Sequence, residues 1–226
     1  MKIAIHQPNF IPWLGYFFKI AKCDYFVFLD DVQYTKNSFI NRNKIRAGNE
    51  EKWLTCPVVT SGEFGKPINK IVYFQPEKSM QTILGQLRAN YGHAPFFEKY
   101  FNMIKHELDL VRHTLADQNI LLIKAIMQEL DIKTPTLRSS DLENIEGSST
   151  ERLVSICNSL KATVYLAGLG SINYQEDELF YTARIKPEIS TFEHPLYSQQ
   201  SDGFIKNLSI IDILFNIGDK TKEYLL

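Results

Sequence analysis

Apolar runs alternate with short polar segments along the first third of the chain. Residues 3–5 and 25–29 are apolar, rich in β-branched or aromatic side chains and too short for helices, so each predicts a buried strand. Residues 13–21 between them predict a single helix. A strand, a helix and a second strand make a βαβ unit, whose ligand crevice lies beyond the carboxyl ends of its parallel strands. The pattern therefore predicts a site near residues 6–12 and 30–31.

The hydrophobic pattern predicts three further groups of elements. The expected strands are 53–59, 69–74, 164–167 and 189–192. The expected helices are 78–91, 96–130 with a turn near residues 117–119, one from a capping box at Ser148 and Glu151 to about residue 160, and 209–217, closed by Gly218. Together they predict an α/β fold with a mostly parallel sheet, an N-terminal βαβ unit and a helical insertion at about 78–133, all within one domain spanning 1–226.

Composition narrows the class of protein. The chain has 226 residues, 44% hydrophobic and 23% charged, which is typical of a globular protein with a substantial core. A formal net charge of -1 supplies no basic field for nucleic-acid binding. The sequence has no signal pattern and no apolar run of about 18 residues, which a membrane span would need, so we expect a cytoplasmic protein.

His6 is the first candidate for chemistry because it ends the first predicted strand. A ring nitrogen there can face the crevice and act as an acid, a base or a phosphate donor near neutral pH. The alternative is a packing or capping histidine held by a backbone carbonyl. Gln7 and Asn9 follow it and are either substrate contacts or ordinary turn residues.

Asp30 and Asp31 come directly after the second predicted strand. Adjacent side chains at a strand end point to opposite sides, so we expect one carboxylate in the cleft and the other in a cap or turn. The carboxylate in the cleft could orient a ribose hydroxyl, accept a proton from an amine or hold Mg²⁺ against phosphates. The pattern favours no metal site, and we predict none.

A polar segment at residues 41–44 is the best phosphate-binding candidate in the sequence. Guanidinium, amide and ammonium groups there could contact phosphate and sugar oxygens. The alternative is a solvated charged loop. The candidate residues are Asn41, Arg42, Asn43 and Lys44, with Tyr34 and Lys36 as secondary candidates.

Two later loops also follow predicted strands. Gly168 and Gly170 could cradle phosphate with backbone amides, although the segment is neither GxGxxG nor a P-loop, and a tight turn is the alternative. His194 is the best partner for His6, with Tyr197 and Gln199 just beyond it as substrate contacts; a proline-fixed loop is the alternative.

Three segments carry a resemblance to a known family. They are the opening HQPNFIPWLGYF, the LDDVQY segment followed by NRNKI, and HPLY with a later glutamine before LSIIDILFNIG. These segments resemble the WbqC-like family of bacterial proteins, nearly from end to end. The resemblance implies a place in polysaccharide or O-antigen biosynthesis and the modification of an activated amino sugar.

A fold-level analogy offers a second reading. The βαβ start followed by an Arg/Lys segment is similar to nucleotidyltransferases and the pantothenate-synthetase group. Those enzymes carry a histidine motif where this chain has Trp13, Leu14, Gly15 and Tyr16, which argues against adenylyl transfer.

The leading hypothesis is an enzyme that forms an amide on a nucleotide-linked amino sugar by acyl or aminoacyl transfer. His6 would take the amine proton, Asp30 or Asp31 would orient the sugar, and Arg42 would engage the diphosphate, with His194 assisting. The donor or co-substrate could be acyl-CoA, an acyl carrier protein or ATP. The alternatives are a nucleotidyltransferase or adenylating enzyme, and a non-catalytic module that binds a sugar nucleotide or a carrier protein.

Overall fold

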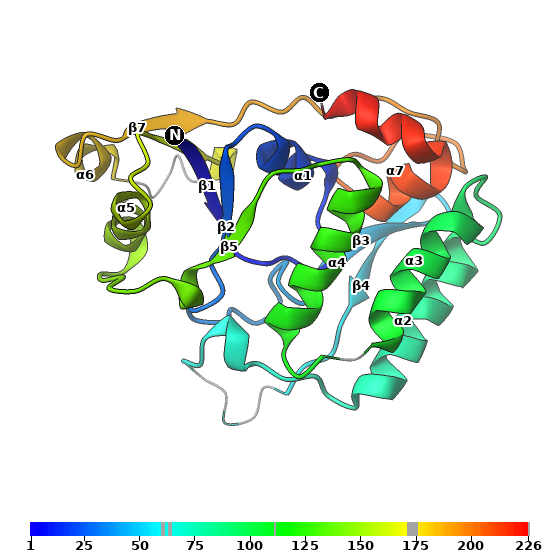
Figure 1. Ribbon diagram of the computed structural model, residues 1–226. Coiled ribbons are helices and arrows are strands. Elements are labelled where there is room, and N and C mark those ends of the chain that lie inside the picture. The colour runs from blue at the N-terminus through cyan, green and yellow to red at the C-terminus, as the bar shows by residue number, and fades with distance from the viewer. Residues whose placement is uncertain (60–61, 63–64, 111, 171–175, 226) are drawn as a thin grey trace.

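A five-stranded parallel sheet forms the centre of the molecule in the computed structural model, which describes residues 1–59, 62, 65–110, 112–170 and 176–225 (Figure 1). The strand order is β5-β2-β1-β6-β7, and every neighbouring pair is parallel. The strands are β1 (Lys2–His6), β2 (Tyr25–Phe28), β5 (Thr136–Arg138), β6 (Val164–Ala167) and β7 (Lys186–Ile189). The chain builds outward from β1 first on one side and then on the other, which is a doubly wound arrangement with its switch point between β1 and β6. The predicted α/β fold with a mostly parallel sheet is confirmed.

Alternating side chains of the central strands supply two separate hydrophobic clusters. In β1, Ala4 packs in the larger cluster, whereas Ile3 and Ile5 pack in the smaller one. Helices α5 (Ser149–Ser159) and α6 (Asp177–Thr182) cover the smaller cluster, and helix α1 (Leu14–Ala21) covers the other face (Figure 1).

The helical insertion comprises α2 (Pro76–Tyr91), α3 (Phe97–Asp109) and α4 (Leu115–Glu129), on the α1 side of the sheet (Figure 1). The predicted turn at residues 117–119 is wrong. Thr114 caps α4 by accepting a hydrogen bond from the Asp117 amide at 3.2 Å, so these polar residues form the first turn of the helix. Gln118 and Asn119 are buried there, and their side chains bond to backbone carbonyls elsewhere.

An antiparallel hairpin lies outside the main sheet. It consists of β3 (Arg42–Ala47) and β4 (Glu50–Thr55), joined through Gly48 at φ +63°. The strand predicted at 53–59 therefore begins and ends earlier, because Pro57 has no amide to continue the ladder. The strand predicted at 69–74 is replaced by a short 3₁₀ turn, η1 (Ile68–Lys70), which buries Ile68, and by a single bridge from Tyr73 to Val58.

In the last third of the chain, the final helix agrees with its predicted bounds more closely than the final strand does. Strand β7 ends at Ile189, where the prediction began, because its register with β6 pairs Lys186 with Val164 and Ile189 with Ala167. Helix α7 (Ile210–Ile217) is followed by Gly218, whose φ of +60° favours glycine at this position. A 3₁₀ segment, η4 (Gly218–Tyr224), follows it. Strand β5, helix α6 and the turn η2 (Ser139–Asp141) were not predicted.

No helix in the described part of the chain has the length and hydropathy needed to cross a bilayer.

Candidate functional site

The loop from β1 to α1 carries the opening motif, and distant side chains hold it in place. Proline-rich turns leave backbone carbonyls without strand or helix partners, and buried carbonyls need donors. Four side chains supply them: Tyr16 to Gln7 O at 3.0 Å, Asn119 to Pro8 O at 2.8 Å, Asn43 to Ile11 O at 2.7 Å and Ser209 to Ile11 O at 2.6 Å. Ile11 has φ +38°, a strained conformation that these bonds maintain. The position of His6 and Gln7 is therefore fixed by the fold.

His6 lies at the carboxyl end of β1, beside the edge of the Tyr16 ring at a centroid distance of 4.9 Å. Its Nδ1 lies 3.1 Å from the carbonyl oxygen of Gln7. When Nδ1 carries the proton and donates to that carbonyl, Nε2 keeps its lone pair as an acceptor. Burial, together with repulsion from Lys19, lowers the pKa of His6 to about 3. The ring is therefore neutral across the physiological range, whereas the sequence predicted titration near neutral pH.

Lys19 is a basic residue of this region that sequence reasoning missed. It is 4% exposed, and its Nζ donates to the carbonyl oxygen of Ile5 at 3.2 Å. Burial lowers its pKa to about 7, against a smaller opposing effect of Cys23. The available signal was that Lys19 is the one charged residue between positions 13 and 21, on a short helix placed between two buried strands.

Two cavities flank His6. The first, which we call the α5 cavity, has a volume of about 330 Å³ and lies between the sheet edge and the start of α5. Its lining residues are Ile5, His6, Gln7, Leu29, Val32, Ser149, Thr150, Arg152, Leu153 and Tyr165. The second, the α1 cavity, has a volume of about 200 Å³. It is lined by His6, Trp13, Gly15, Tyr16, Lys19, Gly168, Leu169, Gly170, Ser190 and Phe192. His6 and the two glycines thus meet at the switch point between β1 and β6, where doubly wound sheets bind ligands.

The α5 cavity has the features of an anion site. Arg152 lines it, and Ser149 and Thr150 bring the first turn of an 11-residue helix to its wall. A helix N-terminus and a guanidinium both favour a negatively charged group. Asp31 pairs with Arg152 at 2.5 Å and compensates part of its charge, but the Nε of Arg152 is buried without a hydrogen-bond partner and remains available as a donor.

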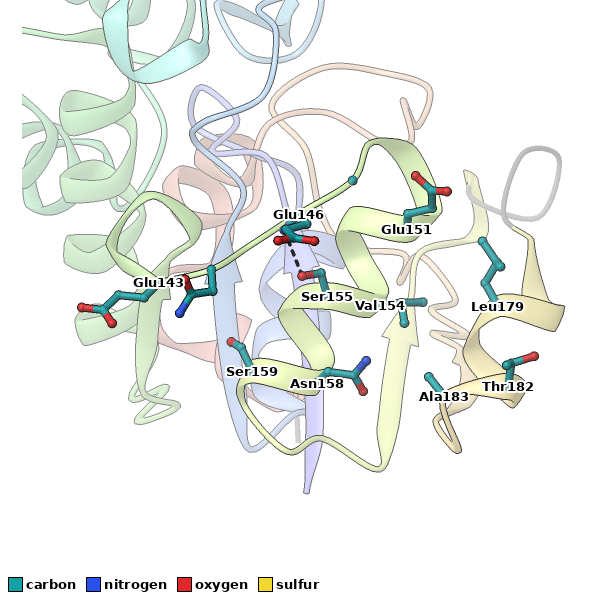
Figure 2. A pocket seen from close by; sticks show the side chains of 12 residues that line it. Glu143, Glu146, Glu151, Val154, Ser155, Asn158, Ser159, Leu179, Thr182 and Ala183 are labelled. Carbon is teal, nitrogen blue, oxygen red and sulfur yellow. Dashed lines mark hydrogen bonds between the residues drawn. The ribbon is translucent and has the colours of Figure 1, made fainter.

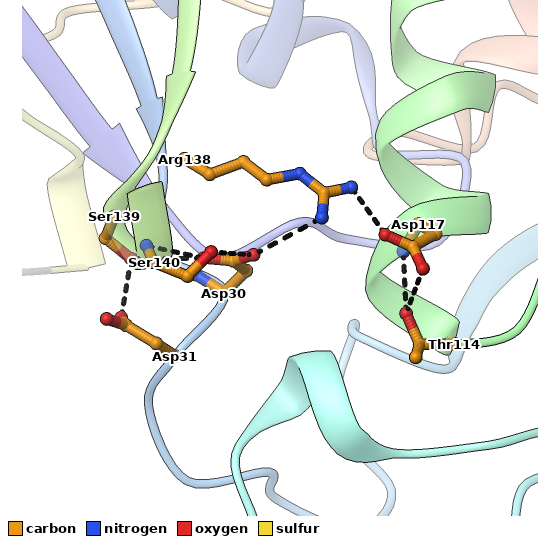
Figure 3. A network of polar contacts seen from close by, with 7 residues as sticks. All are labelled: Asp30, Asp31, Thr114, Asp117, Arg138, Ser139 and Ser140. Atoms are coloured by element: carbon orange, nitrogen blue, oxygen red, sulfur yellow. Dashed lines mark hydrogen bonds and ion pairs between the residues drawn. The ribbon is translucent and has the colours of Figure 1, made fainter. Parts of the chain in front are cut away.

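Asp30 and Asp31 anchor the neighbouring turn η2 (Figure 3). Asp30 is fully buried and accepts hydrogen bonds from the Ser140 amide at 3.1 Å and the Ser140 hydroxyl at 2.9 Å. Asp31 accepts from Ser139 Oγ at 2.5 Å in addition to holding Arg152. Neither carboxylate lines a cavity beside His6. In the described residues, no three His, Cys, Asp or Glu side chains are arranged to hold a metal ion.

The polar segment at 41–44 is part of the fold and lines neither cavity. Asn41 and Asn43 are buried, and Asn41 Nδ2 donates to the Cys56 carbonyl at 3.2 Å. The Arg42 guanidinium stacks on the Trp53 ring at 4.0 Å, and Lys44 pairs with Glu51. Tyr34, which is half-buried, and Lys36, which is exposed, lie on the preceding loop.

His194 follows β7 at the same edge of the sheet but lines neither cavity. Its Nδ1 lies 2.9 Å from the Pro195 carbonyl, and burial lowers its pKa. Phe192 reaches the α1 cavity instead, where its ring packs against Trp13 at a centroid distance of 5.4 Å.

Tyr197 and Gln199 belong to a buried network. Both donate to Asp212 Oδ1, at 2.8 and 2.9 Å, and Arg46 donates to Gln199 Oε1 at 2.6 Å. Asn9 is also buried, at 8% exposure, within the opening loop. Of the residues predicted to bind substrate, Gln7, Gly168 and Gly170 line the cavities beside His6.

A larger hollow of about 980 Å³ lies between α5 and α6 (Figure 2). Glu143, Glu146 and Glu151 line it, and no lining residue is a cation. These carboxylates disfavour an anionic ligand there, unlike Arg152 in the α5 cavity.

The fold and its cavities define a doubly wound α/β protein with a polar crevice at the switch point of its sheet. The chain matches the WbqC-like protein family over residues 7–224, and it belongs to that family. It is 34% identical over 228 residues to the uncharacterized protein Rv1507c of Mycobacterium tuberculosis, an alignment that covers 99% of this chain and 97% of the relative. No solved structure matches the chain significantly.

Proposed function

We propose that this protein is a transferase of polysaccharide biosynthesis that forms an amide on a nucleotide-linked amino sugar by acyl or aminoacyl transfer. The observation that carries the proposal is the position of His6 between an anion-favouring cavity and a cavity lined by Lys19, a second base whose pKa burial lowers to about 7. A diphosphate against Arg152 and the start of α5 would leave the attached amino sugar beside His6. The chain belongs to the WbqC-like family, and its resemblance to that family implies this class of substrate.

In the proposed reaction, His6 orients the attacking amine and Lys19 transfers its proton. The sugar amine attacks the acyl carbonyl, a C–N bond forms, and the bond from the carbonyl carbon to a thiol or phosphate leaving group breaks. His6 Nε2 accepts a hydrogen bond from the attacking amine, which orients its lone pair. A pKa of about 3 makes His6 a weak base, whereas Lys19, at about 7, matches the optimum for a general base near neutral pH. Lys19 therefore takes the proton and returns it to the leaving group.

The test is product formation by the full chain with a panel of nucleotide-linked amino sugars. Each is supplied with an acyl-CoA, an acyl carrier protein or an amino acid with ATP, and amides are detected by mass spectrometry. Lys19→Met should lower turnover by roughly 10²–10⁴, the contribution of a general base. Lys22→Met, an exposed lysine at the end of the same helix, is the matched control and should leave turnover unchanged.

The dependence of turnover on pH separates the roles of the two bases. Because neutral Lys19 is the active form, turnover should rise with pH through about 7. His6→Asn should lower turnover while keeping that inflection, since His6 is already neutral. Pyrophosphate release without an amide would replace the proposal with nucleotidyl transfer, and ligand binding without turnover would replace it with a binding module.

A further inference from the structure

A cavity of about 490 Å³ lies at the start of α4 and shares no lining residue with the cavities beside His6. Its walls combine basic side chains with an apolar surface. The lining residues are Arg112, His113, Asp117, Ile120, Leu121, Lys124 and Arg138. Arginine, lysine and histidine thus supply four of seven lining residues, and Asp117 is the one carboxylate among them.

Ion pairs within the protein compensate only part of this positive charge. Arg138 Nη2 pairs with Asp117 at 2.6 Å, and Arg138 Nη1 lies 3.8 Å from the buried Asp30 carboxylate (Figure 3). Burial opposes ionisation of Asp117, but hydrogen bonds from Arg138 and Thr114 outweigh it and lower the pKa of the carboxyl group. Asp117 is therefore charged at neutral pH and neutralises Arg138.

Arg112 and Lys124 have no carboxylate partner within the described residues. The Nε of Arg112 is also buried without a hydrogen-bond partner. A buried guanidinium N–H without an acceptor is costly, and an anion in the cavity would supply the acceptor. The two uncompensated cations attract a group with at least two negative charges.

We propose that this cavity binds a phosphate-bearing small molecule, with Arg112 and Lys124 contacting the phosphate oxygens. Ile120 and Leu121 form the apolar wall against which the rest of the ligand packs. The volume falls within the range of small-molecule sites. The site is independent of the proposed transfer reaction, because neither cation belongs to the crevice at His6.

A polar network joins this cavity to the α5 cavity, so the experiment must separate the two. The network runs from Arg138 to Asp30 and then through Ser139 to Asp31 (Figure 3). Asp31 in turn holds Arg152. Arg152→Gln removes the cation of the α5 cavity and leaves the cavity at α4 intact.

Isothermal titration calorimetry with pyrophosphate as the probe tests the proposal on the full chain. The variant is Arg112→Gln with Lys124→Gln, and the matched control is Arg184→Gln with Lys78→Gln, two exposed cations with the same total charge change. We expect the variant to weaken binding in the cavity at α4 by about tenfold or more, as for lost charge-assisted hydrogen bonds, whether or not the α5 cavity also binds pyrophosphate, while the control and Arg152→Gln retain this site with wild-type affinity.

Three results would overturn the site: no binding by the wild-type protein at millimolar pyrophosphate, equal losses in the variant and its control, or loss of all binding in Arg152→Gln. Melting temperatures check that the double variants fold. If the Arg112→Gln, Lys124→Gln double variant does not fold, the single variant Lys124→Gln replaces it in the test. Lys124 is exposed, so its substitution changes charge without disturbing the core. Unchanged affinity in Lys124→Gln would then count against the site.

Discussion

Burial favours the neutral state of two basic side chains at the carboxyl edge of the sheet, so that near pH 7 His6 is neutral and Lys19 is partly neutral. His6 and Lys19 reach this state for the same reason, which is the cost of placing a cation in a poorly hydrated site. They are also coupled, because charge on Lys19 lowers the pKa of His6. When Lys19 loses its proton, part of the repulsion that disfavours the imidazolium disappears. The crevice therefore avoids holding two positive charges at once.

The buried Lys19 leads to a stability prediction for Lys19→Met. In the unfolded chain Lys19 titrates near 10.5, and in the folded protein near 7, so unfolding takes up a proton between these values. Wild-type stability should therefore rise with pH from about 7 to 10.5. Lys19→Met lacks this dependence and should be more stable than wild type, with an advantage that is largest below pH 7 and shrinks above it.

Thermal denaturation of both proteins at pH 6 and pH 9.5 measures this difference. Lys22→Met serves as the control, since Lys22 is exposed. A Lys19→Met protein that is less stable than wild type at pH 6 would show that the ammonium group is stabilised by its surroundings.

Asn43 supplies a second residue-level prediction. Its Nδ2 donates to the carbonyl oxygens of Phe10 at 3.3 Å and Ile11 at 2.7 Å, so Asn43→Ala removes the side-chain donor to Phe10 and leaves Ser209 as the side-chain donor to Ile11. We expect a loss of about 1–3 kcal/mol in the free energy of unfolding. Urea denaturation measures it, with Asn102→Ala, an exposed position in α3, as the control. If the two variants lost equal stability, Asn43 would not hold the opening loop.

Among the elements, those defined by apolar runs could be predicted from the sequence. Strands β1, β2 and β6 and helix α7 lie within one or two residues of their predicted bounds, because most residues of each are apolar and buried. The hairpin of β3 and β4 could not be predicted in the same way. Its buried positions include Asn43 and Arg46, which hydropathy assigns to the surface. The Gly48 turn was its one visible signal.

Only the site residues that the strand order places at one edge of the sheet could be predicted from the sequence. Parallel strands bring His6, Gly168 and Gly170 to one edge, which the order of elements indicates. The amides of Asn41 and Asn43 suggest phosphate binding in the sequence, yet their partners are carbonyls that folding brings from distant segments. Arg152 and Lys19 were missed because their importance depends on which cavity each one lines.

The turn η2 gives a prediction at the level of elements. Asp30 connects the end of β2 to this turn through three hydrogen bonds and is fully buried. Asp30→Asn replaces an acceptor oxygen by a donor facing hydroxyl and amide groups, and it leaves Arg138 less compensated. We expect a loss of at least ~2 kcal/mol in the free energy of unfolding.

Asp141→Asn is the local control, because Asp141 lies in the same turn and is exposed. Its free energy of unfolding should stay within about 0.5 kcal/mol of wild type. Similar losses in both variants would mean that the Asp30 carboxylate contributes no more than a surface charge.

For the whole molecule, one hydrophobic cluster joins the helical insertion to the sheet. It contains residues of β1, β2, α1, α2, α3, α4 and α7, as well as the hairpin. Because these elements share buried contacts, we expect them to unfold in one cooperative transition. Scanning calorimetry should give equal calorimetric and van't Hoff enthalpies. Two resolved transitions would instead divide the chain into independently folding parts.

The bonds that hold the opening loop also bear on the order in which the protein is made. Ser209 donates to the Ile11 carbonyl across a sequence separation of 198 residues, and the Ile210 amide bonds to Pro12. A ribosome releases the amino-terminal segment first, so His6 leaves the tunnel long before these partners exist. The nascent chain can pair β1 with β2, but it cannot complete the loop until α7 has been synthesised. Activity should therefore begin only after translation has passed α7. Shorter nascent chains would contain His6 but not the completed crevice around it.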